Sequence, residues 1–305
     1  LSGWKLSGDM TFAATFKEPE GPGNSKLNFS YFQLYAEKQL QENLTLYLSL
    51  AVNSVSAGSD DYVTSVVADT AFLSYSVNDK ISAHIGREII NYGYENPICI
   101  MDEKFVFLPA INSQYFGGYI LRGDGVKFSL RNSFVDADVA YYNIPTTTSL
   151  QSKSLFARVS KTVGGLTAGL NALSADGPDK VTYGIDELIV YGPDVKYKND
   201  VIEFTSELMM VKRKSDLGLG EETINRLGFY SQLTGNILDG GKLYIGGRFD
   251  YIEPFDLGLP KTITKYVSGV VGSYLYDNVM VRGQYKTNVD DGSDCEIGMS
   301  MTVSF

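Results

Sequence analysis

Apolar and polar residues alternate along most of the chain with a period of two. In residues 295–305, one parity holds Ile297, Met299, Met301, Val303 and Phe305, and the other holds Gly298, Ser300, Thr302 and Ser304. Successive side chains of a β-strand point to opposite faces, so this run predicts a strand with one apolar and one polar face. The repetition of the pattern predicts an all-β protein with no second layer to cover its apolar faces.

About sixteen stretches of the chain follow this pattern. We predict strands at 4–16, 31–37, 44–52, 67–77, 81–85, 118–131, 134–144, 153–161, 166–174, 187–198, 201–213, 223–236, 242–253, 263–276, 279–288 and 295–305. Asp69 and Arg87 break the parity of their strands. In the third of these strands, Leu48 is predicted to face outward and Ser49 inward.

The connections between these strands alternate between tight and long. Asn132-Ser133, Gly164-Gly165, Asn199-Asp200 and Asp277-Asn278 have the composition of two-residue hairpin turns. Consecutive hairpins turn at opposite ends of a sheet, so the short turns gather at one end and the long polar loops at the other. This arrangement predicts a transmembrane antiparallel β-barrel that spans residues 1–305.

Composition agrees with a barrel and excludes several other classes. The 305 residues include 21 Tyr and 31 Gly, 20% are charged, and no apolar run reaches the roughly 18 residues of a membrane-spanning helix. A net charge of −10 argues against nucleic-acid binding, since Lys212-Arg213-Lys214 is the only basic cluster. We predict no cofactor and no metal site.

Two features near the loops leave alternatives open. Cys99 and Cys295 form either one disulfide or two free thiols, because a bond requires their loops to approach each other. The last long loop and its flank carry Asp290, Asp291, Asp294 and Glu296, which match no EF-hand spacing. A solvated acidic loop is therefore preferred over a calcium site.

The whole chain resembles the sixteen-stranded bacterial outer-membrane porins. Residues 71–80, Ile85-Gly-Arg-Glu and Asn91-Tyr-Gly-Tyr-Glu are similar to the phosphate-selective-porin-like group, and the terminal Phe305 resembles the C-terminal assembly signal of such barrels. The resemblance implies a bacterial outer-membrane location with lipid around the barrel, and a homotrimer. In the general porins that it resembles, the third long loop folds into the lumen. The corresponding connection here, 89–117, contains Phe105, Phe107 and Phe116, and such apolar residues are not expected to stay extended in water, so we predict the same inward folding. Packing on a neighbouring subunit is the alternative.

A closed sheet of sixteen strands encloses a lumen too wide for side chains to fill, so a water-filled channel is expected. Strand parity and the third loop select the candidates for lining or constricting it: Arg131, Arg158, Arg226, Arg248, Arg282, Lys286, Glu95, Asp102, Glu103, Asp136, Asp138, Glu203 and Glu207. Arg226, Arg248 and Arg282 are expected either to form a basic wall or to be neutralised by lumen acids.

Three functions compete on this evidence. The first is a porin, a passive diffusion channel for small hydrophilic solutes and ions, with weak cation selectivity set by acidic loops at the mouth. The second is a non-conducting barrel that sheathes or anchors another envelope or electron-transfer component. The third is an outer-membrane hydrolase that uses His84, the only histidine. We predict that the protein is not an enzyme, because His84 has no serine motif beside it.

Overall fold

The structure is a computed structural model that describes residues 3–18, 26–56, 62–90, 92, 104–105, 109–110, 122–145, 151–179, 185–216, 221–238, 242–254, 263–290 and 295–305. In these ranges the chain forms sixteen strands: β1 (Trp4–Glu18), β2 (Lys26–Gln41), β3 (Leu44–Ser56), β4 (Tyr62–Asn78), β5 (Ile81–Ile89), β6 (Arg122–Arg131), β7 (Asp136–Pro145), β8 (Gln151–Val163), β9 (Leu166–Asp179), β10 (Ile185–Lys198), β11 (Ile202–Asp216), β12 (Glu221–Asn236), β13 (Leu243–Ile252), β14 (Thr264–Tyr276), β15 (Val279–Asn288) and β16 (Cys295–Ser304). The predicted strand positions are confirmed; residues 118–121 lie outside the described part.

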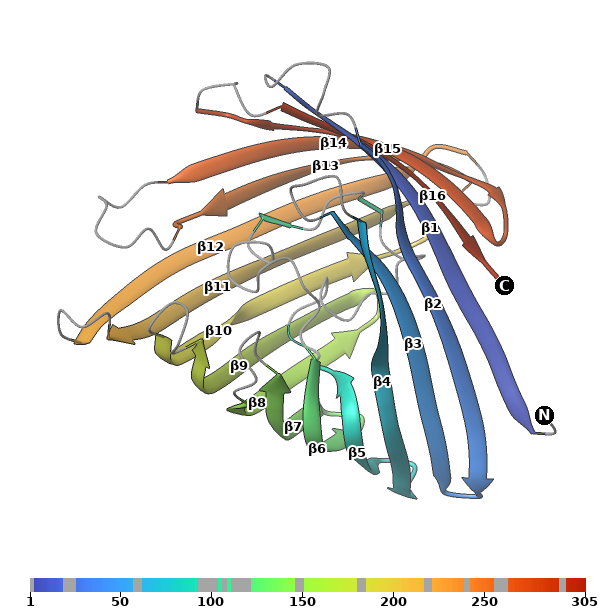
Figure 1. Ribbon diagram of the computed structural model, residues 1–305, viewed down its shortest axis with the longest axis vertical. Coiled ribbons are helices and arrows are strands. Elements are labelled where there is room, and N and C mark those ends of the chain that lie inside the picture. Colours follow the sequence, from blue (N-terminus) through green and yellow to red (C-terminus); the bar gives the residue numbers. More distant parts are fainter. Residues whose placement is uncertain are drawn as a thin grey trace.

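The sixteen strands form one antiparallel sheet that closes into a barrel, with each strand beside its neighbours in sequence. β1 and β16 close it, pairing from Asp9↔Ser304 to Glu18↔Cys295, and Figure 1 shows these two strands side by side. Phe305 extends the ladder, because its N–H donates to the Gly8 carbonyl and its carbonyl accepts the Gly8 N–H, both at 2.9 Å. The C-terminal strand therefore removes the edge of the sheet.

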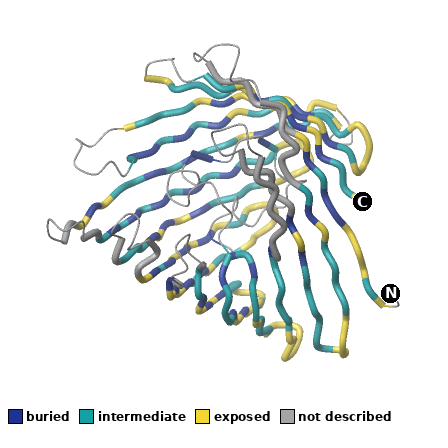
Figure 2. The backbone as a smooth tube through the Cα atoms, in the orientation of Figure 1, coloured by how far each residue is buried: buried dark blue, intermediate teal, exposed yellow. Residues whose placement is uncertain are grey.

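The burial pattern along the strands is the reverse of that in a soluble sheet. On β16, the buried positions are Gly298, Ser300 and Thr302, and the exposed ones are Ile297, Met299 and Met301. Figure 2 shows the same alternation of buried and exposed positions along neighbouring strands. Exposing this much apolar surface to water would cost about 25 cal/mol per Å². The outer face is therefore suited to lipid, and the predicted all-β barrel is confirmed.

Asparagine side chains shape the tight turns at one end of the barrel. The Oδ1 atom of Asn78 accepts the N–H groups of Lys80 and Ile81 at 2.9 and 3.0 Å. Asn132 and Asn199 make the same pair of bonds to the residues two and three positions ahead. These side chains replace the ladder partners that a two-residue turn removes, which is why Asn marks the turns in the sequence.

Asp69 breaks the alternation of β4 because it is an inserted residue. Ser49 pairs with Thr70 and Leu50 with Ala68, so Asp69 forms a bulge between them. Its carboxylate accepts hydrogen bonds from Gln33 Nε2 at 2.5 Å and Ser49 Oγ at 3.3 Å. The bulge thus turns a charged side chain into the barrel. Within the ranges given above, no helix is long and apolar enough to cross a membrane.

Candidate functional site

The inner wall of the barrel carries charges of both signs. A closed single sheet has no second layer, so a buried strand residue between two exposed neighbours faces the interior. The buried charged residues of inward parity, among those described, are Asp9, Asp69, Glu88, Lys127, Asp138, Arg158, Asp194, Glu207, Arg213, Arg248, Asp250 and Arg282. The interior is therefore polar and nearly balanced in charge, as expected for a water-filled lumen.

Described residues of the long connection between β5 and β6 are buried against this inner wall. Ile90, Tyr92 and Ala110 belong to one hydrophobic cluster. Their strand partners come from β7 to β13 and are Ala140, Tyr142, Phe156, Leu173, Val190, Met209, Val211, Tyr230 and Ile252. These strand residues have inward parity, so this part of the connection lies inside the barrel.

A second anchor joins the connection to β13, β14 and β15. Phe105 is fully buried in a cluster with Tyr244, Val270 and Met280. The backbone carbonyl of Lys104 accepts the Tyr244 hydroxyl at 3.0 Å, and the Lys104 ammonium lies 4.4 Å from the centre of the Tyr244 ring. The combination of apolar burial, hydrogen bonding and a cation–π contact fixes these two residues to one side of the wall.

Polar groups of β13 complete this anchor. The Arg248 guanidinium lies 4.7 Å from the centre of the Phe105 ring, and its Nε donates to Asp250 Oδ2 at 3.0 Å. The other carboxylate oxygen of Asp250 accepts the Ala110 N–H at 2.8 Å. Arg248 and Asp250 therefore hold the connection instead of standing free in the lumen.

Gly272 makes room for Tyr244 on the inner wall, and replacing it tests this anchor. A Cβ at Gly272 would lie 2.2 Å from the Tyr244 ring, whereas a Cβ at Gly269, on the same strand, would meet nothing within 4 Å. We expect Gly272→Ala to destabilise the barrel by roughly 1 to 3 kcal/mol through overpacking. Gly269→Ala is the matched control, and reversible unfolding in lipid vesicles measures both. Equal stability of the two variants would show that Tyr244 is not held against Gly272.

A buried ion pair crosses β8, β9 and β10 below Tyr92. Arg158 Nη1 and Nη2 donate to the two oxygens of Asp194 at 2.5 and 3.0 Å, and the Asn171 amide also donates to this carboxylate. Burial, with the nearby carboxylates of Glu207 and Asp194, raises the pKa of the Tyr92 phenol. Tyr92 therefore stays neutral. The Arg158 and Asp194 side chains are themselves almost fully buried.

The three arginines expected to form a basic wall are spread along the barrel. Arg248 pairs in register with Gln232 of β12, and Arg226 lies six residues farther along β12, roughly 20 Å away at about 3.3 Å per residue. On β14, Arg248 pairs with Ser268 and Arg282 pairs with Gly272. These two partners are four residues apart, so the two arginines lie about 13 Å apart along the strands. The Arg282 Nε donates to Ser300 Oγ at 2.7 Å, and Arg282 is 4% exposed. The structure does not bring the three together.

The other predicted pore residues fall into local pairs. Arg131 donates to Asp138 at 2.8 Å, Lys196 binds Glu203 at 2.6 Å, and Lys286 lies 3.5 Å from Glu296. Asp136 lies opposite Arg131 in the ladder. Glu207 is 2% exposed and accepts the Tyr230 hydroxyl at 3.4 Å.

Several predictions fall on residues that the structure does not describe. They concern Glu95, Asp102, Glu103, Cys99, Asp291 and Asp294. Cys295 Sγ lies 3.3 Å from the hydroxyls of Tyr285 and Thr287 on β15. Because Cys99 lies outside the described residues, the disulfide and the two free thiols both stay predictions.

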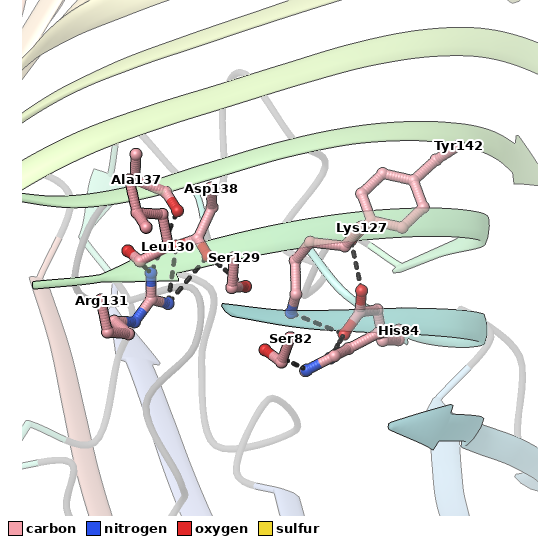
Figure 3. Close-up of polar contacts among 10 residues, drawn as sticks. Ser82, His84, Lys127, Ser129, Leu130, Arg131, Ala137, Asp138 and Tyr142 are labelled. Atoms are coloured by element: carbon pink, nitrogen blue, oxygen red, sulfur yellow. Dashed lines mark hydrogen bonds and ion pairs between the residues drawn. The ribbon is translucent and has the colours of Figure 1, made fainter. Parts of the chain in front are cut away.

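Figure 3 shows His84 in a hydrogen-bonded group on β5, β6 and β7. Its Nδ1 lies 3.0 Å from Glu88 Oε2, which also accepts Lys127 Nζ at 2.6 Å, while Glu88 Oε1 accepts the Tyr142 hydroxyl at 2.7 Å. Ser82 Oγ is 3.5 Å from His84 Nε2. The order serine, histidine, carboxylate resembles a hydrolase triad, but three donors already share the carboxylate.

A triad also needs donors that stabilise an oxyanion, either backbone N–H groups or polar side chains aimed at the reacting atom. The backbone N–H groups around Ser82 belong to the β4–β5 and β5–β6 ladders and are not available for this. The His84 group is therefore organised as a wall network that joins three strands.

Sequence reasoning missed Asp194, the centre of the buried pair. Gly192-Pro193-Asp194 has the composition of a turn, yet it lies within β10. Asp194 lies two residues before Lys196 on β10 and therefore has the same inward parity. Continuing the alternation of β10 across Gly192-Pro193 would have identified Asp194 as an inward residue.

Comparison with solved structures now identifies the fold. The protein is similar over 99% of its length to the trimer form of OmpT from Vibrio cholerae (11% identity, TM-score 0.72, 99% of that chain). It is likewise similar to an anion-selective porin from Comamonas acidovorans (14%, 0.69, 99% of each chain) and to Salmonella typhi OmpF in complex with daunomycin (15%, 0.70, 99% of this chain and 97% of that one). The chain has the sixteen-stranded fold of the bacterial outer-membrane porins. No family model and no curated protein matches the sequence.

In this porin fold, the connection between β5 and β6 is the third loop at the long-loop end. The strand count, the closure through the C-terminal strand and the reversed burial pattern all agree with the fold that the sequence resembled. At sequence identities of 11–15%, these similarities show the fold of the chain and do not identify a solute.

Proposed function

We propose that the protein is a passive diffusion channel of the outer membrane for small hydrophilic solutes and ions. The observation that carries this proposal is the closed sixteen-stranded barrel with its apolar face outward and its charged side chains inward. A barrel of this strand count encloses more space than its own inward side chains occupy. Homotrimers are part of the proposal, since the similar OmpT structure is of a trimer form.

The third loop is proposed to narrow this channel from one side. Tyr92, Lys104, Phe105 and Ala110 are attached to the wall of β7 to β15. Solutes then pass between the loop and the wall of β1 to β4. None of these four strands contains an arginine, but Arg122 of β6 forms an ion pair with Asp69 at this wall. Gln33 and Ser49 bind the same carboxylate.

We expect weak cation selectivity at low salt, which disappears as salt rises. The loops at the mouth carry many acids, among them Asp60, Asp61, Asp256, Asp291 and Asp294. A mouth of one sign concentrates the opposite ion within a Debye length, about 8 to 10 Å at physiological salt. Reversal potentials of single channels in a salt gradient measure this. Anion preference at low salt would instead assign selectivity to the lumen arginines.

Deleting Glu95–Phe116 tests the narrowing loop. We expect a higher single-channel conductance in a planar bilayer, because the obstruction is removed, with the sign of selectivity unchanged. An unchanged conductance would place the constriction elsewhere. If the intact protein does not conduct at all, the channel proposal fails and a barrel that sheathes another envelope component takes its place.

A further inference from the structure

Outward-facing polar residues form a row at the end of the apolar band nearest the long loops. In register across β5 to β8, the row contains Arg87, Asp124, Asn143 and Lys153. Across β10 to β12 it continues with Glu187, Lys214, Lys212 and Asn225. Tyr191, Phe229 and Tyr251 lie just inside this row, with the last two rings 5.3 Å apart. Aromatic residues below charged ones mark the boundary between hydrocarbon and headgroups.

A cavity of about 320 Å³ opens on this boundary between β10 and β13. Its apolar lining includes Tyr191, Met210 and Leu227, and its polar lining includes Lys212, Arg226 and Glu253. Tyr191, Met210 and Leu227 lie in one register row with outward parity. Arg226 has inward parity, but its guanidinium binds the Pro254 and Asn225 carbonyls at the edge that β12 exposes beyond the end of β13, where it also lines this cavity. The outward residues place the mouth of the cavity on the membrane side.

Two cations in this cavity lack carboxylate partners among the described residues. Arg226 donates from Nε to the Pro254 carbonyl at 2.7 Å and from Nη1 to the Asn225 carbonyl at 3.1 Å. Lys212 makes no ion pair with any described carboxylate. By contrast, the nearby Lys214 ammonium lies 3.6 Å from Glu187.

Glu253 does not neutralise both cations. Its two carboxylate oxygens accept the Leu227 N–H at 3.0 Å and the Tyr251 hydroxyl at 3.1 Å. Two cations against one carboxylate give the described lining of the cavity a net positive charge, and its apolar lining lies on the hydrocarbon side. An anionic lipid matches this arrangement, because its acyl chains lie in the hydrocarbon and its charged headgroup lies at the boundary.

We propose that this cavity binds a membrane lipid whose phosphate-bearing headgroup is net anionic, with Lys212 and Arg226 as the phosphate-binding residues. The site lies on the outside of the barrel and goes beyond the proposed channel. Tyr191, Met210 and Leu227 contact the acyl chains next to the headgroup. Binding requires a phosphate joined to a hydrophobic tail, because the basic side of the cavity binds the phosphate and the apolar side binds the tail.

Native mass spectrometry of the purified full-length protein tests the site, with phosphatidic acid, phosphatidylcholine and inorganic phosphate as separate probes. We expect phosphatidic acid to be retained over the other two. Lys212→Gln and Arg226→Gln should each weaken its binding roughly 5-fold, the effect of one basic residue near an anionic lipid. Lys153→Gln is the matched control, because Lys153 is exposed in the same polar row and does not line the cavity.

Lys212→Arg keeps the charge and should bind as the native protein does, which separates loss of charge from loss of folding. An equal loss of binding in Lys153→Gln would overturn the site, because the effect would then belong to the general surface charge. Unchanged binding in Lys212→Gln and Arg226→Gln would also overturn it. If inorganic phosphate binds as tightly as phosphatidic acid, the cavity is a free-anion site and the lipid assignment fails.

Discussion

Replacing Asp194 with alanine is expected to lower the free energy of unfolding by roughly 3 to 5 kcal/mol, the usual effect of leaving a buried charge without its partner. The Arg158 and Asp194 side chains are only 10% and 0% exposed, and Tyr92 packs nearby. Without the carboxylate, the guanidinium keeps its charge in a site from which water is largely excluded. Reversible unfolding in lipid vesicles measures the loss.

Two control variants separate burial from simple ion pairing. Glu37→Ala breaks the Lys5–Glu37 pair, whose atoms lie 2.9 Å apart but whose side chains are 82% and 36% exposed. Solvent screens such a pair, so we expect almost no change in stability. The double variant Arg158→Met with Asp194→Leu removes both buried charges and should recover most of the stability. A loss no larger in Asp194→Ala than in Glu37→Ala would contradict the buried assignment.

Replacing Ile245 with arginine is expected to destabilise the barrel by roughly 2 to 4 kcal/mol, because this charge would face the hydrocarbon. Ile245 is 51% exposed and lies beside Val271 of β14, which is 52% exposed. No water reaches this surface in a membrane, so the guanidinium loses its hydration without gaining a partner. Unfolding in vesicles is again the measurement.

Ile263→Arg is the matched control for depth. Ile263 is also an exposed isoleucine, but it lies at the long-loop end of β14, two residues before Lys265. Near the headgroups the cost of arginine falls to about 0 to 1 kcal/mol. Equal costs at Ile245 and Ile263 would mean that the apolar band is placed wrongly.

The positions of the strands, their two faces and their tight turns could be read from the amino-acid sequence. Alternation is a local property, since each strand residue needs only its neighbours to show which face it occupies. The turns are equally local, because Asn78, Asn132 and Asn199 satisfy backbone groups within three residues. Even the bulge at Asp69 was visible as a break in parity.

Which inward residues contact one another became known from the folded barrel. Ser49 was predicted to face inward and does, but it is 2% exposed and hydrogen-bonded to Gln33 and Asp69, so it is not an open lumen position. Arg226, Arg248 and Arg282 share inward parity and still lie at different levels. Parity gives the face of a residue, whereas its partners depend on the register between strands, which shifts at every bulge and turn.

The third loop was the least readable part of the chain, because an irregular segment has no periodicity to reveal its direction. Its apolar residues indicated that it would be buried, and the wall that receives Phe105 became visible only when Tyr244, Val270 and Met280 came together from three strands. Contacts of this kind join residues more than a hundred positions apart. They depend on the closed barrel, and no local pattern in the sequence records them.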